Sequence, residues 1–140
     1  MTKKELSQYY WLEKEIKDDE ERLRTLREQA TAPHAQRLTG MPHGGNGDHD
    51  KIGKATAEIV DLQAIIAAKQ IQCIHEKQRI ERFIVEIPDS MTRMMFAHRC
   101  IDGMSWQEVA DSMGYRMTGE NARQIFYRYL KQSKNIEASV

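Results

Sequence analysis

The chain has 140 residues, enough for one domain or for two small modules. Hydrophobic residues make up 40% of it, but aromatic residues only 7% and charged residues 30%, which favours a helical, partly elongated protein over a compact globule with a large core. The formal net charge of zero argues against indiscriminate binding to nucleic acid, and the lack of alternating apolar runs argues against a sheet.

The first predicted element is a helix over residues 3–29. Its apolar residues follow a heptad-like pattern that Asp19 interrupts, and oppositely charged pairs at four-residue spacing surround them. The pattern consists of Tyr9, Leu12, Ile16, Leu23 and Leu26. We expect an amphipathic helix that lies on a partner helix and exposes its charged residues to solvent.

A change of composition marks a loop over residues 30–49. The stretch Thr31–Asp50 contains Pro33, Pro42, four glycines and three of the five histidines. Several side chains here could ligate a metal, namely His34, His43, Asp48, His49 and Asp50. Their spacing matches no established set of ligands, so we predict neither a metal nor a cofactor.

The longest periodic pattern predicts a second helix over residues 50–87. Apolar residues recur there every seven positions, at Ile52, Ile59, Ile66, Cys73, Ile80 and Ile87. Lys69 and Glu76 occupy the second core position (d) of two heptads, where an apolar residue is expected, and so interrupt the pattern. The first helix is the natural antiparallel partner, which makes residues 1–88 a helical hairpin. Because the apolar stripe of the second helix outruns the first helix, we expect the hairpin to form oligomers, most simply a homodimer.

A separate C-terminal module is predicted over residues 89–134. Pro88 ends the long helix, and Asp89 or Ser90 caps the next one. That helix extends to Asp102 and Gly103, and its expected core face consists of Met91, Met94, Met95, His98 and Ile101.

The stretch from Ser105 to Lys131 has the pattern of a helix-turn-helix. Ser105 is the expected N-cap of a short helix, with Trp106, Val109, Ala110 and Met113 on one face. Gly114 supplies the turn, for which glycine is suited because it has no Cβ. Thr118 is the expected N-cap of a second helix that ends near Lys131, and residues 135–140 are expected to fray. The apolar stripe of this second helix is Ala122, Ile125, Phe126, Tyr129 and Leu130.

The opposite face of that second helix carries side chains of the types that bind base edges and phosphates. From Gly114 to Lys134 the sequence has five Arg or Lys residues against Glu120 alone, so a basic surface is expected here although the whole chain is neutral. The predicted DNA-binding residues are Arg116, Thr118, Glu120, Asn121, Arg123, Gln124, Tyr127, Arg128 and Lys131. The alternative is a solvated face of a helical bundle that binds no DNA.

Two runs carry a resemblance to known families. The run Thr118–Ile125 (TGENARQI) resembles the T-x-E-x-x-R-Q-I run in the recognition helix of region 4 of bacterial primary sigma factors. This resemblance implies that Glu120, Arg123 and Gln124 face an upstream promoter element. The stretch from Gly114 to Ala122 is longer than in region 4, so either the turn is longer or the second helix begins before Thr118.

The loop motif in Met41–Ile52 (MPHGGNGDHDKI) lies between two long helices and ahead of the helix-turn-helix. In this arrangement the chain resembles small phage-encoded regulators of Gram-positive bacteria, the ArpU-type late transcription regulators and their sigma-like relatives. The resemblance implies a transcription regulator of phage late genes that binds double-stranded promoter DNA and acts with bacterial RNA polymerase.

No set of residues indicates catalysis, so we predict a protein that is not an enzyme. The absence of a membrane-spanning apolar run and of a secretion signal predicts a cytoplasmic protein with two reduced cysteines, Cys73 and Cys100. Two other functions stay open. One is a small-terminase-like packaging component that forms a ring, and the other is an interaction module that docks on polymerase without contacting DNA.

Overall fold

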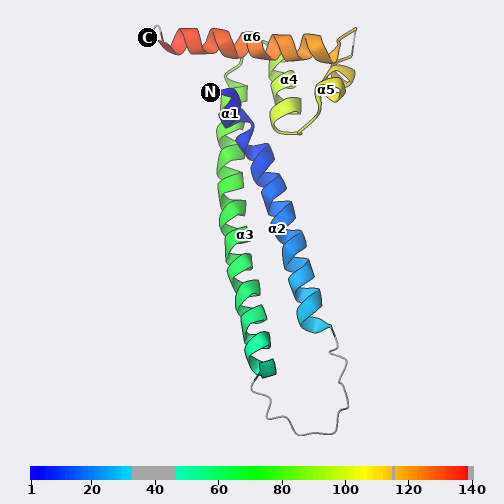
Figure 1. The fold of residues 1–140 in the computed structure, drawn as a ribbon. Coiled ribbons are helices and arrows are strands. Elements are labelled where there is room, and N and C mark those ends of the chain that lie inside the picture. The colour runs from blue at the N-terminus through cyan, green and yellow to red at the C-terminus, as the bar shows by residue number, and fades with distance from the viewer. Residues whose placement is uncertain (33–46, 115, 139–140) are drawn as a thin grey trace. The chain divides into compact units, whose positions relative to one another are not determined.

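The computed structural model describes residues 1–32, 47–114 and 116–138, and within these ranges the regular structure is helical throughout (Figure 1). The helices are α1 (Lys3–Leu6), α2 (Gln8–Thr31), α3 (Gly47–Val85), α4 (Ser90–Cys100), α5 (Trp106–Met113) and α6 (Gly119–Ala138). The predicted all-α class is confirmed. The predicted loop of residues 30–49 falls largely outside the described residues, as do His34 and His43.

The helix predicted over residues 3–29 is in fact two helices, separated at Ser7. Thr2 and Glu5 form a reciprocal cap at the start of α1, with the backbone amide of Glu5 donating to Thr2 Oγ1 at 3.2 Å. The Ser7 hydroxyl donates to the carbonyl of Lys4 at 3.0 Å. A serine that bonds backward in this way competes with helix continuation, and no apolar pattern in the sequence indicates the break.

The chain divides into two compact units, which are described in turn. One comprises residues 1–13 and 72–140, and the other comprises residues 14–71. Helices α2 and α3 each contribute to both.

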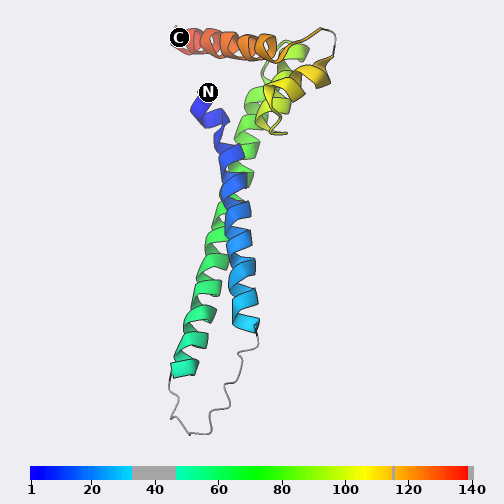
Figure 2. The ribbon, with the colours of Figure 1, turned by 45° about the vertical axis from the view of Figure 1, so that its right-hand side comes forward.

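In the unit of residues 14–71, α2 and α3 pack side by side (Figures 1 and 2). Leu23, Leu62 and Ile66 form its buried cluster, against which Ile16, Leu26 and Ile59 pack. Lys69 of α3 reaches back to Asp19 of α2, while Leu62 packs near Leu23, so the two helices run in opposite directions. Ile52 is wrongly predicted as a seam residue. It is 57% exposed, because the antiparallel pairing places it opposite a position beyond Thr31, where α2 ends.

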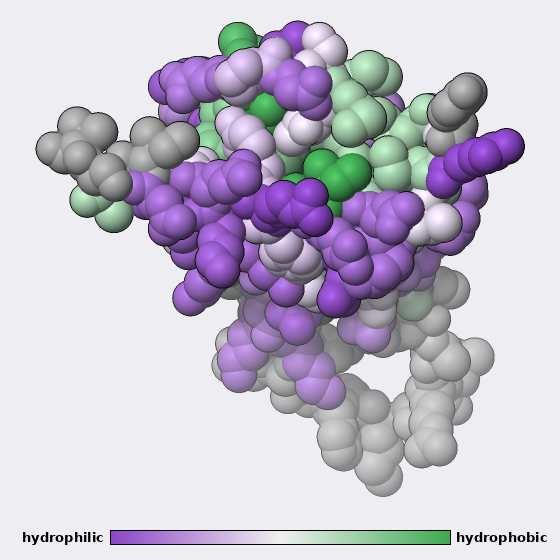
Figure 3. Space-filling view, turned by 90° about the horizontal axis from the view of Figure 1, so that it is seen from above, coloured by the Kyte–Doolittle hydropathy of each residue, from purple (hydrophilic) through white to green (hydrophobic). Residues whose placement is uncertain are grey.

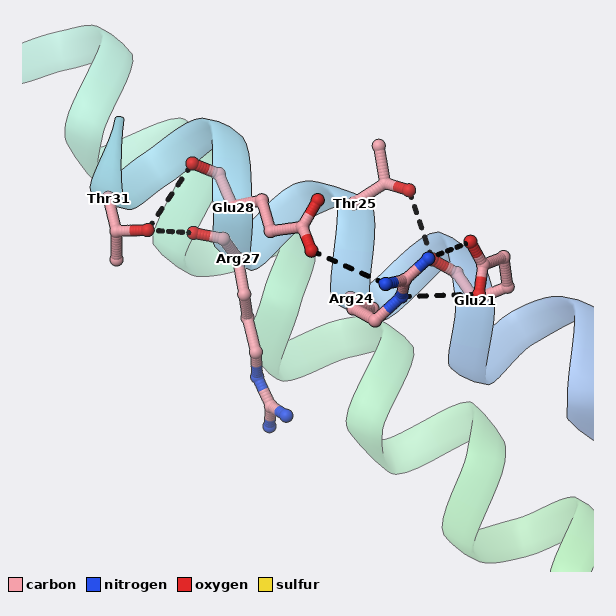
Figure 4. A network of polar contacts seen from close by, with 6 residues as sticks. All are labelled: Glu21, Arg24, Thr25, Arg27, Glu28 and Thr31. Carbon is pink, nitrogen blue, oxygen red and sulfur yellow. Dashed lines mark hydrogen bonds and ion pairs between the residues drawn. The ribbon is translucent and has the colours of Figure 1, made fainter. Parts of the chain in front are cut away.

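The exposed side of α2 carries a network of short-range polar contacts (Figure 4). Arg24 Nη2 lies 2.6 Å from Glu21 Oε1, and Arg24 Nη1 lies 3.6 Å from Glu28 Oε1. Both partners of each pair are more than half exposed, so these contacts contribute little to stability. The charged residues on this side of α2 form solvated surface, as predicted, whereas Asp19 on the side toward α3 is only 14% exposed and pairs with Lys69.

In the unit of residues 1–13 and 72–140, α4, α5 and α6 pack around an aromatic centre. Phe96 of α4 is fully buried, and its ring stacks on Phe126 of α6 with 4.2 Å between centroids. Phe83 of α3 and Tyr129 of α6 approach the same ring, at 6.0 and 5.4 Å. The other large side chains that are fully buried are Ile80, Ile87, Met95 and Val109.

The predicted core face of α4 is partly wrong. Met95 is buried, but Met91 and Met94 are 43% and 50% exposed. The residues of α4 that the structure buries are Thr92, Met95, Phe96 and Cys100. The helix is apolar on several sides, so its hydrophobic residues do not define one face. The predicted cap is confirmed, because Asp89 Oδ2 accepts from the backbone amide of Thr92 at 2.8 Å.

The two cysteines are free and buried. Burial raises the pKa of the Cys100 thiol to about 12, and burial also raises the pKa of Cys73. Among the described residues, no group of three or more His, Cys, Asp or Glu side chains is placed to share a metal ion. None of the described helices combines the length and the apolarity needed to cross a membrane.

Candidate nucleic-acid interface

Helix α5 begins at a reciprocal cap formed by Ser105 and Glu108. The backbone amide of Glu108 donates to Ser105 Oγ at 3.2 Å, and the backbone amide of Ser105 donates to Glu108 Oε2 at 2.6 Å. The predicted N-cap is therefore confirmed. These hydrogen bonds hold the pKa of Glu108 below its ordinary value. Val109 and Ala110 face the core at 0% and 1% exposure, which fixes α5 against its neighbours.

The turn between α5 and α6 depends on two residues with positive φ. Gly114 has φ 67° and ψ −168°, a combination that is essentially restricted to glycine. Its amide donates to the carbonyl of Ala110 at 3.2 Å and closes α5. Arg116 has φ 58°, which is unusual for a residue with a side chain. The amide of Met117 then donates to the carbonyl of Gly114 at 3.4 Å.

Helix α6 begins at Gly119, and Thr118 is its cap. Thr118 Oγ1 accepts from the backbone amide of Asn121 at 3.2 Å, as predicted. Of the two explanations for the long interval between Gly114 and Ala122, the structure has the longer turn. The helix also continues to Ala138, beyond the end predicted near Lys131.

The start of α6 lies directly against the start of α5. A Cβ at Gly119 would lie 3.2 Å from the carbonyl carbon of Trp106 and 3.3 Å from the amide nitrogen of Gln107. Trp106 also contacts α6 one to two turns later, where its ring lies 5.1 Å from that of Phe126 in an edge-on arrangement. These contacts set the crossing of the two helices and hence the direction in which the outer face of α6 points.

The predicted apolar stripe of α6 faces the core. Ala122, Phe126 and Leu130 are buried, and Ile125 and Tyr129 are half-buried. All but one of the predicted DNA-binding side chains are exposed, namely Arg116, Thr118, Glu120, Asn121, Arg123, Gln124, Arg128 and Lys131. Figure 3 looks onto the side of the molecule along which α6 runs, and hydrophilic residues cover much of it.

Three of these side chains form a small surface array at the beginning of α6. Arg123 Nε lies 3.5 Å from Glu120 Oε2, and Gln124 Nε2 donates to Glu120 Oε1 at 3.3 Å. They are the residues that, by the resemblance of this run to sigma region 4, are predicted to face bases. By contrast, Arg116, Arg128 and Lys131 form no ion pair with any other described residue, so their charges face solvent.

Tyr127 differs from the other predicted residues because it is half-buried. Its ring lies 5.2 Å from Lys3 Nζ of α1 and 5.9 Å from the guanidinium carbon of Arg123. The sequence pattern did not identify Lys3, since its place beside α6 depends on a contact between opposite ends of the chain. Lys3 adds a positive charge next to the face on which Arg123 lies.

Tyr127 also lines an aromatic cavity of about 370 Å³. Tyr10, Trp11, Trp106 and Phe126 contribute to its lining, together with the cations Lys3 and Arg99. Arg99 is held in place, because its guanidinium carbon lies 4.7 Å from the Trp106 ring centre and its Nη1 donates to the carbonyl of Met104 at 2.6 Å. The residues that line this cavity come from α1, the beginning of α2, α5 and α6, among others. We therefore regard these residues as part of the core that holds α6 in place beneath its exposed face.

Comparisons with models of protein families, with curated proteins and with solved structures found no match to this chain.

Proposed function

We propose that this protein is a non-enzymatic, sequence-specific DNA-binding transcription regulator whose helices α4–α6 act as a sigma-region-4-like helix-turn-helix. The observation that carries the proposal is the outer face of α6. It is polar and basic, lies immediately after a short capped helix and a glycine turn, and is backed by a buried apolar stripe. We further propose that it regulates phage late genes together with host RNA polymerase, on the basis of the loop motif in Met41–Ile52.

In the proposed complex, the beginning of α6 enters the major groove. The capped helix terminus directs its partial positive charge toward a phosphate. Glu120 accepts a hydrogen bond from a cytosine or adenine amino group, and Gln124 pairs with an adenine edge. Arg123 exchanges its contact with Glu120 for a guanine or a phosphate. The contacts of Glu120 with Arg123 and Gln124 in the free protein support this assignment, because they hold the three side chains close together on one side of α6.

The unpaired cations provide the sequence-independent part of the binding. Arg116, Arg128 and Lys131 neutralise backbone phosphates, and each contact releases condensed counterions. One such module makes few contacts, so useful affinity requires a dimer or a tether to polymerase. We propose a homodimer in which the two modules act together.

A selection of bound sequences from a random duplex library tests the proposal without knowledge of the operator. The native protein should enrich a defined motif, and the Arg123→Ala/Gln124→Ala variant should retain duplexes but enrich no motif. Arg22→Ala is the matched control, because it removes an exposed positive charge on α2, outside the proposed interface. If the native protein retains no duplex at low salt, DNA binding is rejected. That result would favour a protein that docks on polymerase without contacting DNA, which is the alternative that the zero net charge of the chain also favours.

A further inference from the structure

The aromatic cavity that Tyr127 lines has the size of a binding site for a small molecule. Its volume is about 370 Å³, and ligand sites in proteins enclose roughly 300–1,000 Å³. Closely packed protein interiors contain few voids larger than a water molecule. All of the lining residues belong to the unit of residues 1–13 and 72–140, so the cavity lies within one compact unit. A volume at the lower end of the range suits a ligand of one or two rings.

Aromatic rings from three helices line the cavity. Tyr10 and Trp11 come from α2, Trp106 comes from α5, and Phe126 and Tyr127 come from α6. Neighbouring rings meet at steep angles, with 78° between the planes of Tyr10 and Trp11 and 68° between those of Trp106 and Phe126. A flat ligand among such rings can stack on one of them and meet the edge of another, which are the two favoured aromatic geometries. The walls therefore suit a planar aromatic molecule.

The cavity has an entrance and an apolar floor. Lys3 is exposed and Trp11 is 55% exposed, although both line the cavity, so it opens to solvent on their side. Leu6, Cys100 and Phe126 also line it, and these three are buried. A ligand can thus enter beside a lysine and a tryptophan and reach apolar surface without unfolding of the core.

The charged residues of the lining are two cations, Lys3 and Arg99. Arg99 Nη1 donates to the carbonyl of Met104 at 2.6 Å, and the guanidinium carbon lies 4.7 Å from the centre of the Trp106 ring. Lys3 Nζ lies 5.2 Å from the centre of the Tyr127 ring. A carbonyl and an aromatic ring hold a cation in place but leave it with its full charge.

The acidic residues nearest to these cations in the chain make contacts elsewhere. Glu5 accepts a hydrogen bond from the backbone amide of Thr2 at 2.7 Å and lies 3.7 Å from Arg79. Asp102 lies 2.8 Å from His98. Neither Glu5 nor Asp102 lines the cavity. An anion from outside the chain would therefore meet two positive charges beside apolar walls, where ion pairing is stronger than in bulk water.

We infer that this cavity binds a small aromatic molecule with one anionic group, whose ring lies among the aromatic walls and whose charge lies toward Lys3 and Arg99. The guanidinium supplies directed N–H donors for an acidic group, and the lysine adds a second positive charge at the entrance. Because Phe126 and Tyr127 belong to α6, the ligand contacts the helix whose outer face is proposed to bind DNA. The inference goes beyond that proposal and does not depend on it.

Two fluorescent probes that share an aromatic scaffold separate the role of the rings from that of the cations. Anilinonaphthalene sulfonate carries an anionic group, and N-phenylnaphthylamine has the same scaffold without it. In titrations followed by probe fluorescence, the native protein should bind one molecule of either probe per chain. Trp11→Ala should weaken the binding of both, because it removes part of the aromatic wall at an exposed position.

Charge variants test the recognition of the anionic group. Arg99→Gln should weaken binding of the sulfonate about tenfold, as expected for the loss of a charge-assisted hydrogen bond. Lys3→Gln, at the exposed entrance, should weaken it by a smaller factor. Both variants should bind the uncharged naphthylamine as the native protein does, which also shows that the cavity is intact. Lys4→Gln is the matched control, because Lys4 is an exposed lysine of the same helix that does not line the cavity.

The site would be overturned by a native protein that binds neither probe saturably, or by binding of both probes that Trp11→Ala leaves unchanged. Recognition of the anionic group would be overturned by an unchanged affinity for the sulfonate in both charge variants. It would also be overturned by equal losses of the two probes in Lys3→Gln, whose exposed side chain can be replaced without disturbing the core. These outcomes are the same whether or not α6 binds DNA.

Discussion

Lys69 and Asp19, the residues that interrupt the apolar seams of their own helices, meet each other across the α2–α3 pair. Lys69 Nζ lies 2.6 Å from Asp19 Oδ2 and 3.5 Å from Glu15 Oε2. The Asp19 side chain is 14% exposed and that of Lys69 27%. The hydrogen bond to Asp19 raises the pKa of Lys69. Because only one register brings the two together, the pair selects that register over its neighbours.

Removing one member of this ion pair should lower the free energy of unfolding, whereas replacing both members by apolar residues should change it little. Lys69→Met is expected to destabilise the protein by about 1–3 kcal/mol, because the largely buried Asp19 carboxylate loses its partner. The Asp19→Leu/Lys69→Leu variant should regain most of that stability. Lys77→Met is the control, since Lys77 makes only an exposed contact with Glu81 at 4.0 Å, and its effect should stay within about 0.5 kcal/mol. Urea unfolding measures all three. A loss in the double variant as large as that in Lys69→Met would mean that the unpartnered Asp19 carboxylate is not the cause of the loss.

The exposed residues of α6 should fall into two groups, those that contact DNA bases and those that contact the DNA phosphate backbone. Gln124→Ala should flatten the base preference at one position with a small loss of affinity. Arg128→Ala should weaken binding to every duplex and reduce the slope of log affinity against log salt by about one. Filter binding over a series of base substitutions and salt concentrations distinguishes the two effects.

The Arg116→Ala variant, measured in the same experiment, could contradict this assignment. Its positive φ places it in the long turn before α6, at the edge of the proposed interface. If Arg116→Ala abolishes base preference while Gln124→Ala keeps it, the sigma-like alignment of α6 is wrong and the turn carries the readout.

Replacing each of two glycines by alanine should change the stability of the protein in opposite directions. Gly53 lies within α3, and a Cβ added to it would meet no atom within 4 Å, so Gly53→Ala should stabilise the helix by about 0.5–1 kcal/mol. Gly119→Ala should destabilise by about 1–3 kcal/mol, because its Cβ would press on the backbone of Trp106 and Gln107. Thermal unfolding followed by circular dichroism gives both values. Stabilisation by Gly119→Ala would show that α5 and α6 separate without penalty.

The cap of α4 should make the protein sensitive to acid. Two hydrogen bonds from Thr92, to the Asp89 carboxylate at 2.7 and 2.8 Å, hold the pKa of Asp89 below its ordinary value of 3.8. A carboxylate with a lowered folded-state pKa stabilises fully above about pH 4, and this contribution is lost as the pH falls through the folded-state pKa. Asp89→Asn should therefore flatten the decline in stability below about pH 4. Asp18→Asn, at an exposed position that caps no helix, is the control. Denaturant unfolding at a series of acidic pH values measures the difference, and identical profiles for the native and Asp89→Asn proteins would contradict the role of the cap.

The sequence predicted those features that depend on strict periodicity or on local capping. The seam at Ile59 and Ile66 follows from the heptads, and the caps at Asp89, Ser105 and Thr118 follow from residue type and position. The break at Ser7 was not predicted, because one serine is compatible with a continuous helix. The predicted α6 is too short because the residues after Lys131 have no strong apolar pattern, although the helix accommodates Ser133, whose Oγ donates to the carbonyl of Leu130.

For the candidate site, the exposed face of α6 could be predicted because it is the complement of an apolar stripe on the same helix. The contact of Tyr127 with Lys3 could not, because the two residues are separated by most of the chain and neither belongs to a motif. The length of the turn was likewise open, because the positive φ of Arg116 is a tertiary outcome that residue type does not favour.

Burial of Cys100 makes this thiol a built-in probe of the core formed by α4, α5 and α6. With 5% exposure and a pKa of about 12, it presents almost no thiolate to a reagent while that core is closed. Alkylation of Cys100 therefore requires an opening of the core, and its rate relative to that of an unfolded thiol gives the free energy of that opening. The same measurement with and without duplex DNA would report whether a ligand on the outer face of α6 holds the helices behind it together.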